Sequence, residues 1–219
     1  MSIPYNPLDK MNLAQSIAEA LLMRPVAGLA QTDGLIGAGV YALYYTGDFA
    51  PYASIAAQNL EGKFQQPIYV GKAVPKGSRK GGLNFGTASG YPLRGRLRHH
   101  ATSIDQVDNL DLGDFHFRSL VVDDIWIPLG ENMMIEMFKP IWNWVVDGFG
   151  NNKPGSGREK QCKSPWDVLH PGRRIARNLA ESPYTQEVLT TRLQQYFAGT
   201  LDFKALEQVA EAEATSDET

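Results

Sequence analysis

The chain has 219 residues, of which 43% are apolar and 21% charged, with a formal net charge of −3. These values are close to the globular average and allow a sizeable core. No apolar run approaches the roughly 18 residues of a membrane span, and the N-terminus lacks the features of a signal peptide. The single cysteine, Cys162, excludes an internal disulfide and a cysteine-based zinc site. We therefore expect a cytoplasmic protein with no membrane partner.

Apolar spacing predicts four helices, and β-branched and aromatic runs predict three strands. In chain order they are a helix, two strands, a helix, a strand and two helices, over 11–23, 39–46, 67–73, 93–104, 115–124, 128–140 and 184–197. The polar, glycine-rich loop 74–92 is too long for an ordinary connection. The turn-rich segment 147–172 is predicted to be an irregular surface excursion. The acidic tail is expected to fray at its end.

Positive charge is concentrated in two parts of the chain. Residues 62–100 contain eight basic and no acidic residues, and a second basic segment covers 152–178. If the fold brings these segments together, they form an electropositive face suited to phosphate binding. If not, they only solvate different sides of the molecule. Charge alone leaves both interpretations open.

Two short motifs lie on the first two predicted strands. They are Gly39-Val40-Tyr41 and Tyr69-Val70-Gly71. Further along, four polar residues follow on or near the predicted helices, namely Arg96, His100, Glu131 and Asn143. The first two are four residues apart, so they share one face of a helix.

In this order, the two tripeptides and the four polar residues resemble the catalytic motifs of the GIY-YIG nucleases, with valine in place of both central isoleucines. Longer strings, among them PIYVGKAVP and SPWDVLHPGR, resemble the type II restriction endonucleases that cut CCGCGG. This resemblance runs from about Gly37 to Gln195. Loop lengths differ after Tyr45 and within 74–92, which leaves the contacts of those loops open.

The length of the chain indicates one domain over 1–219, and the order of the predicted elements indicates an α/β (α+β) fold. Together with the resemblance, this predicts a GIY-YIG nuclease core with a short mixed or antiparallel central sheet flanked by helices. Residues 1–36 are assigned to an N-terminal helical arm. Residues 37–145 are assigned to the catalytic core, including the DNA-contacting loop 74–92. Residues 146–219 are assigned to a basic DNA-contacting segment, a helix and the acidic tail.

The resemblance also implies a set of catalytic residues, namely Tyr41, Tyr69, Arg96, His100, Glu131 and Asn143. Glu131 is expected to bind one Mg²⁺, with Mn²⁺ as a substitute, because magnesium keeps several waters and takes further ligands from the substrate phosphate. Arg96 suits the scissile phosphate. Tyr69 would position water or phosphate, and Asn143 would orient a neighbour or buttress a loop.

Tyr41 is the family's candidate for accepting the proton of the attacking water. A tyrosine with a reference pKa of about 10 needs nearby cations that favour its phenolate. His100, Lys72 and the metal-bound water are the expected sources of that influence. Whether Tyr41 or a neighbour is the general base stays open.

Other acidic and histidine residues have weaker claims to the site. Glu136 competes with Glu131 for the metal, but only Glu131 has the family's spacing of twelve residues to Asn143. A surface pair with Lys139 is expected for Glu136. Asp123 and Asp124 could form a second carboxylate site, although a strand-ending turn is the default. The remaining histidines, His99, His116 and His170, are interpreted as structural or solvent-facing.

Target recognition is expected from basic and amide side chains around the core. Arginine or lysine bound to guanine is the favoured direct readout, while most such side chains should contact phosphate. The candidates are Lys72, Lys76, Arg79, Lys80, Arg94, Arg98, Asn151, Asn152, Lys153, Arg158, Lys160, Lys163, Arg173 and Arg174.

The resulting prediction is a homodimeric restriction endonuclease that hydrolyses both strands of duplex DNA. A companion DNA methyltransferase is implied by the same resemblance. The alternatives are a repair or mobile-element nuclease and a catalytically inactive DNA-binding relative. The first usually carries a separate DNA-binding domain in a longer chain, and the second usually lacks part of the catalytic set.

Overall fold

The computed structural model describes residues 6, 8–74, 90–151, 162–204 and 206. Its helices and strands are α1 (Lys10–Leu22), β1 (Ala27–Gly28), β2 (Gly39–Tyr45), α2 (Ala53–Asn59), β3 (Tyr69–Ala73), α3 (Pro92–Asp105), β4 (Phe115–Val121), α4 (Ile127–Phe138), α5 (Ile141–Trp144), α6 (Pro165–Leu169) and α7 (Gln186–Phe197). Short 3-10 helices cover Ala50–Tyr52, Leu112–Asp114, Asp124–Trp126 and Arg174–Ala176. Within the described residues, no helix is long and apolar enough to cross a membrane.

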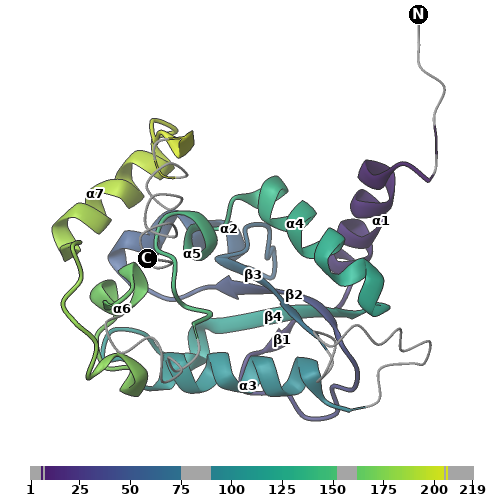
Figure 1. Cartoon of the computed structure of the whole chain (residues 1–219), viewed down its shortest axis with the longest axis horizontal. Coiled ribbons are helices and arrows are strands. Elements are labelled where there is room, and N and C mark those ends of the chain that lie inside the picture. Colours follow the sequence, from purple (N-terminus) through teal and green to yellow (C-terminus); the bar gives the residue numbers. More distant parts are fainter. Residues whose placement is uncertain (1–5, 7, 75–89, 152–161, 205, 207–219) are drawn as a thin grey trace, which may run out of the picture.

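The centre of the fold is a four-stranded sheet in the order β1-β4-β2-β3. Every pairing is antiparallel, and Tyr41 on β2 lies opposite Gly71 on β3 and Ser119 on β4. The sheet lies between α3 on one side and α1 with α4 on the other (Figure 1). The predicted α+β fold is confirmed, and the sheet is antiparallel rather than mixed.

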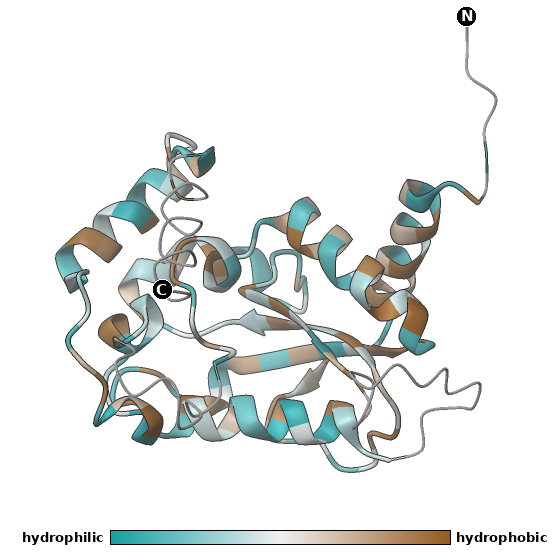
Figure 2. Ribbon diagram, in the orientation of Figure 1, coloured by the Kyte–Doolittle hydropathy of each residue, from teal (hydrophilic) through white to brown (hydrophobic). Residues whose placement is uncertain are grey.

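Strand β2 is buried along its whole length, and its side chains alternate between two apolar layers. On the side called here the α3 face, Tyr41, Leu43 and Tyr45 belong to one cluster, together with Leu93 and Leu97 of α3. On the opposite side, the α4 face, a second cluster combines alternate β2 residues with residues of α1 and α4, namely Val40, Ala42, Tyr44, Ala18, Leu21, Ile127 and Met134. The ribbon of α3 is more hydrophilic than those of α1 and α4 (Figure 2).

The long predicted elements agree with the structure to within a few residues, whereas short ones differ. The strand expected over 115–124 ends at Val121, and α4 ends at Phe138. Lys139 stops that helix by adopting a left-handed conformation with φ of 41°. The helices α2 and α5 and the two-residue β1 have too few residues for a periodic signal.

The prediction of an irregular surface excursion over 147–172 is wrong for much of its described part. Helix α6 lies within it, capped by Ser164, whose side chain accepts a hydrogen bond from the Asp167 backbone. Trp166 and His170 are buried. A polar, glycine-rich composition predicts turns correctly, but it does not show that a few aromatic residues among them pack into the core.

Candidate active site

The two tyrosines of the tripeptides come from neighbouring strands. Their ring centroids are 6.3 Å apart. Gly71 lies opposite Tyr41, and a Cβ atom at Gly71 would overlap the Tyr41 hydroxyl and press on the Tyr69 ring. The last glycine of the second motif therefore lets the Tyr41 phenol extend across β3.

Helix α3 brings two further residues of the predicted set to these tyrosines. The Tyr41 hydroxyl lies 2.7 Å from Nε2 of His100, which is fully buried. Arg96, one turn earlier, is hydrogen-bonded to the side chains of Tyr41 and Tyr69. Its Nη2 also donates to the Gly150 carbonyl at 2.8 Å. The i, i+4 spacing places both side chains on the helix face that meets the sheet.

Glu131 reaches the same region from α4. Its carboxylate forms a 2.6 Å ion pair with Nζ of Lys72 on β3, and its side chain is 14% exposed. The charge of Glu131 also raises the pKa values of Tyr41 and Tyr69, so it lies within electrostatic range of both.

The competing carboxylates lie elsewhere. Glu136 is on the exposed side of α4, with its carboxylate 3.9 Å from Nζ of Lys139. Asp123 and Asp124 begin the 3-10 helix that precedes α4. Across the described residues, no three His, Cys, Asp or Glu side chains gather as a metal-binding group. Glu131, already paired with the cation of Lys72, is a single carboxylate suited to a metal that keeps most of its waters.

Asn143, on α5, supports the edge of the sheet. Its Oδ1 accepts from the Val70 backbone N–H at 2.9 Å, and its Nδ2 donates to the Val70 carbonyl at 2.9 Å. The Asn143 side chain thus makes the pair of hydrogen bonds that the backbone of a further strand beside β3 would make. This contact holds β3 at the residue between Tyr69 and Gly71.

Burial dominates the electrostatics of the cluster. It raises the pKa of Tyr41 well above its usual value, an effect that Tyr69 reinforces and Arg96 opposes. Burial, followed by the charge of Arg96, holds the pKa of His100 well below its usual range. At neutral pH the pair is therefore a phenol and a neutral imidazole. A neutral His100 does not supply the positive charge that was expected to favour the Tyr41 phenolate. The cation that lowers the pKa of Tyr41 is Arg96 instead.

Phe149 is a member of this cluster that the sequence interpretation missed. Its ring stacks on His100 with centroids 4.5 Å apart and an interplanar angle of 18°. It also meets the Tyr69 ring edge-on at 5.2 Å. The sequence feature that could have indicated this role is a single large apolar residue between Gly148 and Gly150 in an otherwise polar stretch.

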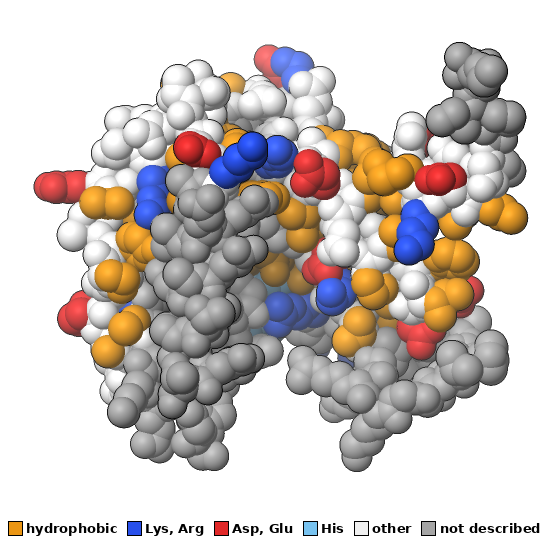
Figure 3. All heavy atoms as spheres, turned by 45° about the horizontal axis from the view of Figure 1, so that its top comes forward, with side chains coloured by type: hydrophobic (Ala, Val, Ile, Leu, Met, Phe, Trp, Pro, Cys, Tyr) orange, Lys and Arg blue, Asp and Glu red, His pale blue; other side chains and the backbone are white. Residues whose placement is uncertain are grey.

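The described DNA-contact candidates occupy different surroundings. The Arg94 guanidinium carbon lies over the Tyr91 ring, 4.0 Å from the ring centroid. Arg98 and Lys163 form exposed ion pairs of 2.7 Å with Asp33 and Glu181. Asn151 and Arg174 are exposed. On one side of the molecule, Lys and Arg side chains gather in a hollow of the surface (Figure 3). The candidates outside the described residues are Lys76, Arg79, Lys80, Asn152, Lys153, Arg158 and Lys160.

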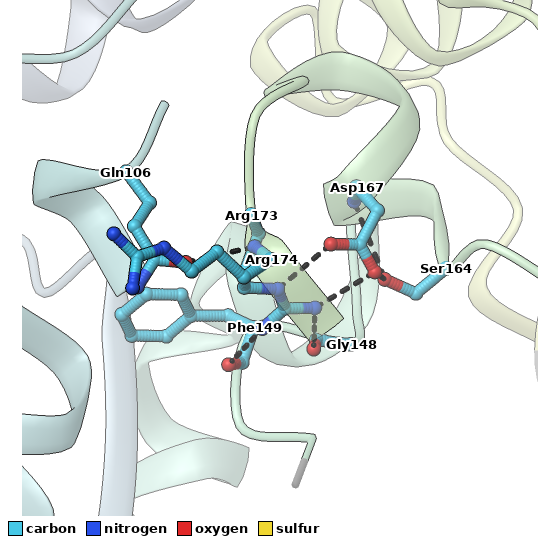
Figure 4. A network of polar contacts seen from close by, with 7 residues as sticks. All are labelled: Gln106, Gly148, Phe149, Ser164, Asp167, Arg173 and Arg174. Atoms are coloured by element: carbon cyan, nitrogen blue, oxygen red, sulfur yellow. Dashed lines mark hydrogen bonds and ion pairs between the residues drawn. The ribbon is translucent and has the colours of Figure 1, made fainter. Parts of the chain in front are cut away.

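Arg173 does not fit the prediction of DNA contact. It is only 2% exposed. Its guanidinium is bound to the carboxylate of Asp167 and to the carbonyls of Gly148 and Phe149 (Figure 4). A basic residue in a turn-rich stretch suggests a solvated cation, but here the Asp167 carboxylate and the two carbonyls satisfy the guanidinium in the interior.

The other histidines remain outside the cluster around Tyr41 or at its edge. His170 is buried, with Nε2 2.6 Å from the Tyr52 hydroxyl and Nδ1 2.9 Å from Oδ1 of Asn109. Burial lowers its pKa to about 3. His99 is half-buried beside His100, and His116 packs on Phe64.

A family model described as the Eco29kI GIY-YIG domain matches residues 33–197. The match extends from ahead of β2 to the end of α7, so it includes every described residue of the cluster. No curated protein matches the chain.

Proposed function

We propose that this nuclease is a type II restriction endonuclease. The chain belongs to the Eco29kI GIY-YIG domain family. Its target would be CCGCGG in double-stranded DNA. The observation that carries the proposal is the convergence of Tyr41, Tyr69, Arg96 and His100 beside a single carboxylate.

Phosphodiester hydrolysis needs an activated water, stabilisation of the phosphoryl charge and help for the departing 3′ oxygen. Glu131 would hold the divalent metal, for which Mg²⁺ is the natural candidate and Mn²⁺ a substitute. Such an ion, when bound, supplies Lewis acidity and lowers the pKa of a bound water. Lys72, now paired with that carboxylate, would supply a cation to the DNA backbone.

Arg96 and the tyrosines would serve the reacting phosphate. The Arg96 guanidinium, already at both tyrosine hydroxyls, matches two phosphate oxygens at once. Tyr41 would accept the proton of the attacking water at its Oη while its own proton passes to Nε2 of His100. The 2.7 Å separation allows that transfer, and His100 can take part because its lowered pKa leaves the ring neutral, with one ring nitrogen unprotonated.

The twofold symmetry of CCGCGG calls for two active sites, one for each strand. A homodimer with matching symmetry would provide them. Restriction activity also requires protection of the host's own sites, so a companion methyltransferase would be its functional partner.

The test is cleavage of an unmethylated plasmid of known sequence, with Mg²⁺ or with EDTA. The wild type should give discrete fragments that map to CCGCGG, and EDTA should abolish them. Glu131→Gln should reduce the cleavage rate by about 10²–10³-fold or more, because it removes the charge that holds the metal. The matched control, Glu136→Gln, changes a carboxylate on the same helix but away from the cluster and should cleave like the wild type.

Two outcomes would overturn the proposal. Random nicking, or binding of the plasmid without cleavage, would point to a repair nuclease or an inactive DNA-binding relative. Undiminished cleavage by Glu131→Gln would show that the metal is held elsewhere.

A further inference from the structure

Residues 148–150 form a short segment that contacts three members of the candidate site. The Gly150 carbonyl accepts a hydrogen bond from Nη2 of Arg96 at 2.8 Å. Phe149 stacks on the His100 ring and meets the Tyr69 ring edge-on. The positions of Arg96 and His100 therefore depend on where this segment lies.

The segment has little conformational constraint of its own. Gly148 has φ of +96°, a region that side-chain-bearing residues rarely adopt. A Cβ atom at Gly150 would lie 2.6 Å from the Tyr69 hydroxyl and 3.0 Å from Nη2 of Arg96. Neither glycine can be exchanged for a stiffer residue without strain, so the segment must be held from outside.

Arg173 supplies that restraint. Its Nη1 donates to the Phe149 carbonyl at 2.9 Å, and its Nη2 donates to the Gly148 carbonyl at 3.0 Å. Asp167 fixes the guanidinium through two contacts of 2.7 Å, and the Ser164 hydroxyl donates to that carboxylate at 2.6 Å. Figure 4 shows the Arg173 guanidinium between the Asp167 carboxylate and the carbonyl oxygens of Gly148 and Phe149, with both carbonyls turned toward it.

This ion pair is nearly inaccessible to solvent, with Arg173 2% and Asp167 5% exposed. Removing two charges from water has a large cost, and apolar residues of similar volume often replace such a pair without loss of stability. Apolar residues could not, however, donate hydrogen bonds to the Gly148 and Phe149 carbonyls. The feature that distinguishes the pair is therefore the geometry it imposes.

We propose that Arg173, held by Asp167, is a positioning residue of the nuclease: it fixes the 148–150 segment so that Arg96 and His100 keep their orientation toward Tyr41. The proposal rests on the proposed function, because it assigns Arg173 a role in the same site. Arg173 then acts through other residues and does not touch DNA.

The central variant is the double substitution Asp167→Leu with Arg173→Met, which removes both charges together and leaves an apolar contact. The single Arg173→Lys keeps a positive charge but cannot reach the carboxylate and both carbonyls with one planar group. The matched control is Tyr52→Phe, which loses buried hydrogen bonds to His170 and Trp142 but none to residues 148–150.

Three quantities separate positioning from plain stability: the urea unfolding midpoint, the Kd for a target duplex in EDTA, and the single-turnover cleavage rate. For the double variant we expect a cooperative unfolding transition, a Kd within about threefold of the wild type and a cleavage rate lowered about 10²-fold. A small misplacement of catalytic groups by a distant change can have this effect. Arg173→Lys should recover part of the rate, and Tyr52→Phe should stay within about threefold of the wild type.

A pH profile provides a readout that a purely structural role would not change. The groups that face His100 are Tyr41, Tyr69, Arg96, His99 and Arg173. Arg173→Lys keeps this set of charges, but it loosens Phe149 and admits water to the imidazole. The pKa of His100 should then rise toward its usual value, so the acid side of the rate profile should move to higher pH.

The proposal is overturned if the folded double variant cleaves within about threefold of the wild type, or if Tyr52→Phe loses as much activity. If the double variant does not fold, Arg173→Lys decides: an unchanged rate and pH profile would reject the positioning role. Failure of the proposed function has a different signature, because it would already appear without any Arg173 variant: the wild type would nick at random or not cleave, or Glu131→Gln would cleave undiminished.

Discussion

The two faces of the central sheet differ sharply in the side chains they bury. Tyr41 and Tyr44 are three residues apart on β2, and both are fully buried, but they point to opposite faces. On the α3 face, Tyr41 meets His100 and Arg96. On the α4 face, Tyr44 packs edge-on against Phe64, with the Arg118 guanidinium over its ring at 4.9 Å.

The difference shows how one strand can serve stability and chemistry at once. Alternation along β2 sends every second residue into the apolar layer under α1 and α4, where burial of nonpolar surface stabilises the fold. The remaining residues face α3, where burial instead shifts the pKa values of Tyr41 and His100 in opposite directions. The apolar face therefore supports a site whose polar groups are costly to bury.

The largest expected effect comes from exchanging one hydroxyl on each face. Tyr41→Phe should lower the single-turnover cleavage rate by about 10²–10⁴-fold, because it removes the group that exchanges protons with water and His100. Tyr44→Phe, on the same strand, should stay within a few-fold of the wild type. Equal losses of cleavage rate from the two substitutions would contradict the assignment of catalysis to the α3 face alone.

A large-to-small substitution on the α4 face should lower stability without lowering the cleavage rate. Leu21→Ala in α1 should lower the free energy of unfolding by about 2–5 kcal/mol, since it leaves a cavity in a closely packed layer. Urea denaturation would measure that loss. The cleavage rate per folded molecule should be unchanged at low urea, and a drop of tenfold or more would show that α1 also shapes the site.

The last effect concerns pH and the buried histidines His100 and His170, both of which have lowered pKa values. Below the unfolded-state pKa of about 6.5, the unfolded chain takes up protons that the folded histidines do not. Stability should therefore be complete above pH 6.5 and fall toward pH 3, by up to about 1.4 kcal/mol per pH unit for each histidine.

Urea midpoints measured at pH 7 and pH 5 would reveal this dependence. His170→Gln should make the midpoint less sensitive to pH, because one of the two buried imidazoles is gone. An unchanged sensitivity would mean that His170 takes up its proton in the folded state as readily as in the unfolded one.

Features that depend on local patterns along the chain could be predicted from the sequence. Runs of β-branched and aromatic residues predicted strands that contain Tyr41 and Tyr69, and the four-residue interval placed Arg96 and His100 on one helix face. These features survive folding because a strand or a helix orients neighbouring side chains by its own geometry. The α+β class follows from the order of these elements, whereas the catalytic set was indicated by the resemblance to the GIY-YIG nucleases.

Contacts between side chains of different elements depend on tertiary packing and could not be predicted from the sequence. Arg173 is predicted from the sequence as a DNA contact, yet Asp167 and the carbonyls of Gly148 and Phe149 hold it in the interior. Phe149 becomes the stacking partner of His100, and Asn143 takes the place of a neighbouring strand for Val70. Such roles depend on partners brought close by packing, and no spacing along the chain encodes that proximity.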